Sequence, residues 1–87
     1  MEKYKIIVKK SVAKDLRPLP QKDVAVIIKC IESLKEEPRP FGCEKLSGQE
    51  RYRIRKGVYR IIYEIQDDVL VVIVVTVVHH KKIYRTS

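Results

Sequence analysis

The spacing of hydrophobic residues changes along the chain and predicts both strands and helices. Segment 4–10 is short and rich in β-branched residues, which favours a strand. Ser11 is a good N-cap, and the residues after it predict a short helix that ends at Pro18. A longer helix is expected to begin near Pro20, because its apolar residues recur at helical spacing. This stripe, which we expect in the core, consists of Val24, Ile27, Ile28, Ile31 and Leu34.

The second half of the chain has the pattern of consecutive antiparallel strands. Prolines and glycines between 37 and 48 predict a loop, and three strands follow at about 50–55, 58–65 and 69–78. The last of these has no polar alternation, so we expect it to be central and covered on both faces.

The order strand, helix, helix and three strands predicts an α+β fold. We expect one domain over residues 1–87, with two N-terminal helices packed on one face of a small, mainly antiparallel twisted sheet. A chain of this length buries a modest core and can fold alone.

A two-residue turn at Lys56–Gly57 predicts which side chains share a face of the sheet. Counting outward from the turn places Arg53, Arg55 and Arg60 on one face, with Arg53 directly opposite Arg60. Glu64 falls on the same cationic face. The other face is expected to be core and consists of Tyr52, Ile54, Tyr59 and Ile61. A three-residue loop would instead scatter the arginines over both faces.

The net charge of the chain indicates a function for the arginines that share one face of the sheet. The 19 lysines and arginines outnumber the 11 acidic residues, and the formal net charge is +8. Such an excess indicates an acidic partner, with a simple solubility surface as the alternative. Like charges placed directly opposite each other destabilise a sheet, so the arginines favour a surface that binds a polyanion.

The C-terminal segment adds to the same region. It should emerge near Arg60, because the last two strands run antiparallel. Its cations and rings are His79, His80, Lys81, Lys82, Tyr84 and Arg85. A basic patch with aromatic residues is typical of nucleic-acid binding.

Other classes of function are less well supported by the sequence. Cys30 and Cys43 are too few for a disulfide framework or a zinc site, so we expect no metal and no cofactor. The N-terminus lacks the apolar run of a signal peptide, and the run at 69–78 is too short to span a bilayer. We therefore expect a cytoplasmic protein with no membrane partner.

Four motifs resemble the RelE/ParE superfamily of toxins, on its RelE side. They are "PRPFGCEKLSG", "YRIRKGVYRIIYEI", "DDVLVVIVV" and the closing "HHKKIYR". The resemblance covers nearly the whole chain. It implies a toxin of a type II toxin–antitoxin pair that cuts mRNA in the ribosomal A site. The implied partners are the ribosome, mRNA and a cognate antitoxin that blocks the site.

The resemblance also implies roles for particular residues. Arg53, Arg55 and Arg60 match the basic sheet residues of the family, His80 its C-terminal acid and Tyr84 its C-terminal tyrosine. The remaining basic residues would bind RNA or the ribosome, namely Arg51, Lys56, His79, Lys81, Lys82 and Arg85.

Two positions depart from the family pattern. Arg55 stands where some members have a lysine thought to act as base, and arginine does not give up its proton in proteins. Glu64 is then a candidate base or a partner for Arg53, and Tyr84 and His79 are alternative bases. His80 stands where many members have arginine, and its ordinary pKa of about 6.5 suits a general acid.

Two other functions remain open at this point. A ParE-like toxin that inhibits gyrase would share the fold but act as a binding protein. A catalytically weak homologue would bind only RNA or its antitoxin.

Overall fold

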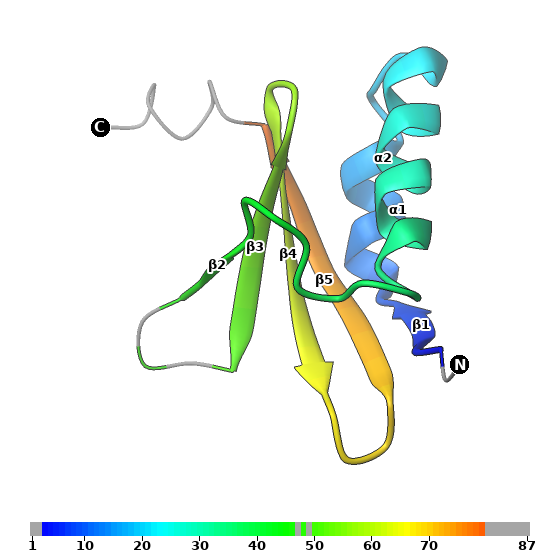
Figure 1. Cartoon of the computed structure of the whole chain (residues 1–87). Coiled ribbons are helices and arrows are strands. Elements are labelled where there is room, and N and C mark those ends of the chain that lie inside the picture. Colours follow the sequence, from blue (N-terminus) through cyan, green and yellow to red (C-terminus); the bar gives the residue numbers. More distant parts are fainter. Residues whose placement is uncertain (1–2, 47, 49, 80–87) are drawn as a thin grey trace.

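The computed structural model describes residues 3–46, 48 and 50–79, and within them it contains two helices and five strands (Figure 1). In chain order these are β1 (Lys5–Val8), α1 (Lys10–Leu16), α2 (Gln21–Ser33), β2 (Glu44–Lys45), β3 (Arg51–Lys56), β4 (Tyr59–Gln66) and β5 (Val71–His79). The predicted order is confirmed, and β2 adds a short strand inside the segment expected to be a loop. Neither of the described helices is long and apolar enough to cross a membrane.

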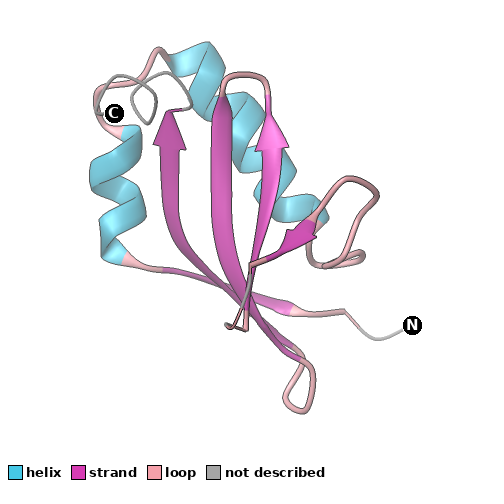
Figure 2. Cartoon of the chain, turned by 90° about the vertical axis from the view of Figure 1, so that its left-hand side faces the viewer, coloured by secondary structure: helices cyan, strands magenta, loops and turns pink. Residues whose placement is uncertain are grey.

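The strands form one twisted sheet in the order β1-β5-β4-β3-β2. β1 runs parallel to β5, and every other neighbouring pair is antiparallel. Both helices lie on the same side of this sheet, and no helix among the described residues covers its other face (Figures 1 and 2). We call this uncovered side the open face.

The core lies between the helices and the sheet. From the helices it takes Val12, Ile27, Ile31 and Leu34, and from the sheet Tyr59, Ile61, Tyr63, Ile65, Val72, Val74 and Val77. Tyr52 and Ile54 pack against it, so the predicted core face of the hairpin is confirmed. The helical stripe is narrower than expected, because Ile28 is 39% exposed. β5 is buried only toward the helices, since its other side chains are half-buried.

The β3–β4 turn lies one residue later than the sequence predicted. Lys56 pairs with Tyr59, so the two loop residues are Gly57 and Val58. Gly57 has a φ of +61°, a value that the first loop position of a favoured two-residue hairpin requires. Moving the turn by one residue shifts the pairing by two, and each side chain therefore keeps its predicted face. The predicted pairing of Arg53 with Arg60 was wrong, since Arg60 pairs with Arg55.

A β-bulge interrupts β5 in the middle of the strand. Ile62 pairs with Thr76 and Tyr63 with Val74, which leaves Val75 as the extra residue. Ser11 and Asp15 of α1, which lie one turn apart, form hydrogen bonds with the polar groups at the bulge.

Three hydrogen bonds connect α1 to the bulge in β5. Ser11 donates its hydroxyl to the Val75 carbonyl at 2.7 Å. Asp15 accepts hydrogen bonds from the Thr76 hydroxyl at 2.7 Å and from the Val77 amide at 3.0 Å. Ser11 was predicted to cap α1, but that helix begins at Lys10.

The bulge decides where the end of β5 points. Beyond it, Val77 is buried, Val78 pairs with Arg60, and His79 pairs with Tyr59. The rings of His79 and Tyr59 meet edge to face, 5.2 Å apart. The predicted approach of this strand end to Arg60 is therefore confirmed for the described residues.

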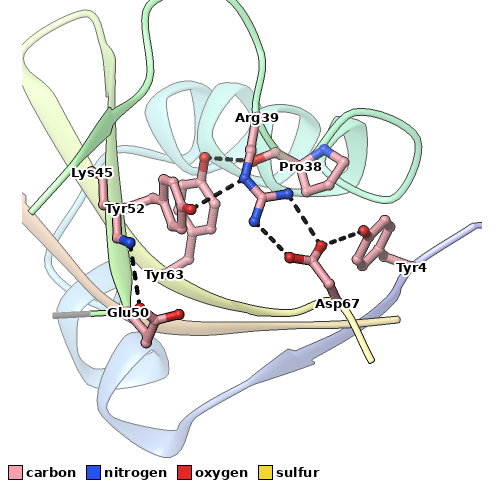
Figure 3. A network of polar contacts seen from close by, with 8 residues as sticks. All are labelled: Tyr4, Pro38, Arg39, Lys45, Glu50, Tyr52, Tyr63 and Asp67. Atoms are coloured by element: carbon pink, nitrogen blue, oxygen red, sulfur yellow. Dashed lines mark hydrogen bonds and ion pairs between the residues drawn. The ribbon is translucent and has the colours of Figure 1, made fainter. Parts of the chain in front are cut away.

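At the opposite end of the sheet, four side chains form what we call the Arg39 clasp: Tyr4, Arg39, Tyr52 and Asp67 (Figure 3). Arg39 donates two hydrogen bonds to the Asp67 carboxylate, at 2.7 and 3.1 Å, and a third to the Tyr52 hydroxyl at 3.1 Å. Tyr4 donates its hydroxyl to Asp67 at 2.6 Å. The hydrogen bonds from Arg39, and then from Tyr4, lower the pKa of Asp67 to about 2.

Candidate nucleic-acid interface

Four arginines of β3 and β4 lie on the open face, and we call this group the arginine face: Arg51, Arg53, Arg55 and Arg60. They alternate with Tyr52, Ile54, Tyr59 and Ile61, which pack toward the helices. The backbone therefore gathers the cations on one side, as the sequence predicted.

Two of the four arginines have carboxylate partners on the neighbouring strand. Arg51 donates to Glu64 at 3.0 Å, and Arg53 donates to Glu44 of β2. Each carboxylate stands directly opposite its arginine in the register. Glu64 was considered a partner for Arg53, and that pairing was wrong.

The other two arginines face each other. Arg55 and Arg60 are directly opposite across the β3–β4 ladder, and neither is in an ion pair with another described residue. Such a pair of like charges is destabilising by itself. The Nε atoms of Arg53 and Arg60 are also buried, and no described group accepts a hydrogen bond from them. Buried donors without acceptors are rare in folded proteins, and each carries a penalty.

The neighbouring arginines favour the ionised form of the Glu44 carboxylate. The hydrogen bond from Arg53 lowers the pKa of Glu44 below its ordinary value, and the charges of Arg55 and Arg60 lower it further. One carboxylate thus lies within the field of three cations. With Glu64 as the second carboxylate, the described residues leave two of the four positive charges on the arginine face uncompensated.

The structure separates two other predicted binding residues from this face. Lys56 follows Tyr52 and Ile54 in the alternation, so it lies toward the helices and borders α2. His79 packs on Tyr59 and lines a cavity of about 500 Å³ beside α1. The remaining predicted residues, His80, Lys81, Lys82, Tyr84 and Arg85, lie outside the described residues.

Sequence reasoning missed two features of the site. Glu44 lies in a segment that was expected to be a loop, and its contact with Arg53 depends on the pairing of β2 with β3. Half-buried apolar residues also border the arginines on the open face, among them Ile62, which pairs with Arg53, and Val78, which pairs with Arg60. The run of valines without polar alternation in β5 was the available signal for this apolar border.

Known proteins resemble this chain in sequence and in fold. A family model described as ParE toxin of type II toxin-antitoxin system, parDE, matches residues 6–84. A Methanocaldococcus jannaschii protein that carries the toxin name RelE1 is 30% identical over 87 residues, which is 95% of this chain and 97% of the relative.

Two solved structures extend the likeness to three dimensions. A RelE–RelB complex from Pyrococcus horikoshii OT3 contains a chain with a TM-score of 0.80 and 29% identity; the match covers 88% of this chain and 94% of that one. The toxin–antitoxin complex RelBE2 from Mycobacterium tuberculosis gives a TM-score of 0.79 at 25% identity, with 88% and 98% covered.

The fold and the family match define the class of this protein as a small toxin of type II toxin–antitoxin systems. The chain belongs to the ParE toxin family, within the RelE/ParE superfamily, and its solved structural neighbours are RelE toxins. The family implied by the sequence motifs is thereby confirmed.

Proposed function

We propose that the protein is a ribosome-dependent endoribonuclease, which cuts mRNA in the ribosomal A site and so stops translation in the cytoplasm. The observation that carries this proposal is that Arg55 and Arg60 lie directly opposite each other with no ion-pair partner among the described residues. An RNA phosphate would supply the negative charge that this pair of arginines lacks.

The reaction makes defined demands on the arginine face. The ribose 2′-oxygen attacks the adjacent phosphorus, the bond to the 5′-oxygen breaks, and extra negative charge develops on the phosphoryl oxygens in between. Arg53 and Arg60 would stabilise that charge through their guanidinium groups, since both residues lie on the open face. Arg55 would hold the phosphate for in-line attack but cannot act as a base.

Two proton transfers complete the reaction. His80 would donate a proton to the departing 5′-oxygen, and Tyr84 would stack on a base or orient it. On the described part of the face, Glu64 is the candidate that takes the proton from the 2′-hydroxyl. Because Arg51 donates a hydrogen bond to Glu64, the carboxylate would have to exchange this partner for the ribose. His79 and Tyr84 are the alternative bases.

The proposed partners follow from the same chemistry. The ribosome and mRNA would contact the wider basic set: Arg51, Lys56, His79, Lys81, Lys82 and Arg85. A cognate antitoxin would block the site, since relatives were solved in complexes with RelB antitoxins.

Primer-extension mapping of mRNA ends after induction tests the proposal. The expected result is new 5′-ends within codons of translated messages, together with a rapid fall in translation. In a purified translation system the same cuts should appear with ribosomes and should be absent on naked mRNA. Intact mRNA during growth arrest would contradict the proposal.

The family description favours one second candidate, a gyrase inhibitor like ParE. It predicts a different outcome of the same induction. DNA breaks and stalled gyrase would precede any fall in translation, and the Arg60→Ala variant would stay toxic. Harmless accumulation would indicate the third alternative, a homologue that only binds RNA or antitoxin.

A further inference from the structure

The two cysteines of the chain, Cys30 and Cys43, take no part in the arginine face or in the Arg39 clasp. Cys30 belongs to α2 and packs against the hydrophobic core, and Cys43 directly precedes β2. Both are half-buried free thiols. The proposed cleavage reaction does not use them.

The strand register places Cys43 on the helix side of the sheet. Glu44, the next residue, pairs with Arg53 and forms an ion pair with it on the open face. Side chains alternate between the two faces along an extended chain, so Cys43 is directed toward the helices. This is the side on which α2 carries Cys30.

Tyr63 brings the two thiols to one point of the core. Its side chain is fully buried, and its hydroxyl donates to the Pro38 carbonyl at 2.8 Å. Burial, then the adjacent Cys43 thiol and then the Cys30 thiol raise the pKa of this hydroxyl. Cys30 also lines a cavity of about 650 Å³ together with Gly42, the residue before Cys43. The two thiols therefore border the same space from two different elements.

This cavity gives a small oxidant access to the thiols. Cys30 lines it, and Phe41, which also lines it, is fully exposed. Burial raises the pKa of the Cys30 thiol, and the charge of Lys56 acts in the opposite direction. Because the thiolate is the reactive form, oxidation at this site should be faster above neutral pH.

We propose that Cys30 and Cys43 form a redox-sensitive modification site, at which hydrogen peroxide converts the two thiols to an intramolecular disulfide. One thiolate attacks a peroxide oxygen, the O–O bond breaks, and a sulfenic acid forms with release of the first water. The second thiol attacks the sulfenic sulfur, the S–S bond forms, and the hydroxyl leaves as a second water. The two thiols are oxidised by two electrons in all, one peroxide is reduced, and both thiol protons leave in the waters.

The disulfide ties α2 to the start of β2 and so affects the arginine face. β2 consists of two residues, and Glu44 in it follows Cys43 directly. A fixed start of β2 keeps Glu44 against Arg53, which lowers the positive charge available to RNA. This regulatory consequence rests on the proposed function, whereas the disulfide itself does not.

Mass spectrometry of the full-length protein tests the site. The protein is treated with hydrogen peroxide at pH 7 and at pH 9, and remaining thiols are alkylated before digestion. The expected product is a monomer lighter by two hydrogen atoms, in which the peptides that contain Cys30 and Cys43 are cross-linked. The cross-link should form faster at pH 9, and dithiothreitol should reverse it.

Thermal unfolding of the two redox forms provides a second measurement. The oxidised protein should unfold about 10 °C higher than the reduced protein, because a cross-link that closes a loop of roughly 15 residues restricts the unfolded chain. Cys43→Ser is the matched control and should show no rise after peroxide treatment. Cys30→Ser should behave in the same way, and circular dichroism confirms that each variant is folded.

The effect on the arginine face is measured with a labelled single-stranded RNA and no ribosome. Fluorescence anisotropy should show the oxidised protein binding about threefold more weakly than the reduced protein, a difference of the size expected for one exposed ion pair. Glu44→Gln lacks the carboxylate, so its two redox forms should bind the RNA equally.

Three outcomes would overturn the site. They are higher oxides on separate cysteines in place of a disulfide, a disulfide that forms only between two molecules, or a cross-linked protein that unfolds no higher than the reduced one. Equal RNA affinity of the two redox forms of the parent protein would refute the link to the arginine face. If mapping shows no mRNA cleavage while peroxide forms the disulfide, the proposed function fails and the modification site stands.

Discussion

Arg39 and Arg60 show two opposite ways of placing an arginine against the same sheet. The side chain of Arg39 is 42% exposed, yet it makes three hydrogen bonds and an ion pair. The Nε of Arg60 is buried, yet no acceptor for it exists among the described residues, and its directly opposite neighbour is another arginine. A protein selected only for stability would do the reverse, because water satisfies an exposed cation and a buried one needs partners.

This difference between Arg39 and Arg60 distinguishes an arginine with a structural role from one with a proposed functional role. The Arg39 clasp joins the start of the chain, the loop after α2, β3 and the β4–β5 turn, and it would be useful in any protein of this fold. Under the proposed function, the like-charge pair of Arg55 and Arg60 lowers the stability of the free protein and would be stabilised by a bound polyanion. Arginines without carboxylate partners among the described residues, rather than the number of cations, therefore define the proposed functional surface.

The largest expected effect concerns Arg60. Arg60→Ala should reduce cleavage of ribosome-bound mRNA by about 100-fold, the loss typical for one group that stabilises transition-state charge. Its thermal unfolding midpoint should stay equal or rise, because the substitution also removes the repulsion from Arg55. Cleavage assays with purified ribosomes and calorimetry measure the two quantities.

The matched control for Arg60 is the clasp arginine. Arg39→Ala should lower the unfolding midpoint and leave cleavage by the folded protein unchanged. If Arg60→Ala unfolds the domain, or if Arg39→Ala abolishes cleavage, the division between the two regions is wrong.

The next largest effect concerns the β5 bulge. Asp15→Ala removes the acceptor of the Thr76 hydroxyl and of the Val77 amide, and we expect a loss of about 1–3 kcal/mol in the free energy of unfolding. Denaturant unfolding checks this value. Ser11→Ala deletes one hydrogen bond to the Val75 carbonyl and should have a smaller effect. Equal stability of Asp15→Ala and the parent protein would show that α1 does not support the bulge.

A smaller effect, with the opposite sign, is expected at Arg55. Arg55→Thr should stabilise the free protein by about 0.2–1 kcal/mol, since it ends the like-charge pairing with Arg60. The gain should shrink as salt rises, because the repulsion is screened. Denaturant unfolding at low and high salt measures the change. A loss of stability would mean that Arg55 has a supporting role in the hairpin.

The smallest effect concerns the acid stability of the clasp. The pKa of Asp67 is about 2 in the folded protein and lies near 3.8 ordinarily, so the unfolded state binds more protons between these values. The contribution of Asp67 to stability is therefore complete above about pH 4 and is lost as the pH falls through 2. Asp67→Asn should be less stable than the parent at pH 6, and the difference should narrow toward pH 2. A constant difference would show that the carboxylate charge does not matter.

Much of the fold followed from the sequence because strand alternation is robust. The turn was placed one residue too early, yet every arginine kept its face, since the pairing moved by two residues. The pairing of Arg55 with Arg60 depends on Gly57 being the first loop residue, whereas the sequence analysis placed it second, after Lys56.

Other parts of the site depend on contacts between residues far apart in the chain. Glu44 reaches Arg53 only because the loop after α2 returns as a strand at the edge of the sheet. The bulge at Val75 is stabilised by hydrogen bonds to Ser11 and Asp15, which are more than 60 residues away from their partners in the chain. No local pattern in the sequence of β5 predicts this bulge. Such features follow from tertiary packing and not from local propensity.

The central claim is that the arginine face, and not the clasp, meets RNA, and side-chain NMR tests it most directly. Arginine Nε–H resonances of the full-length protein, assigned with single Arg→Lys variants, are followed as a short single-stranded RNA is added without ribosomes. The account predicts that the resonances of Arg53 and Arg60 shift with RNA concentration while that of Arg39 stays in place. A shift at Arg39 with none at Arg53 and Arg60 would contradict it.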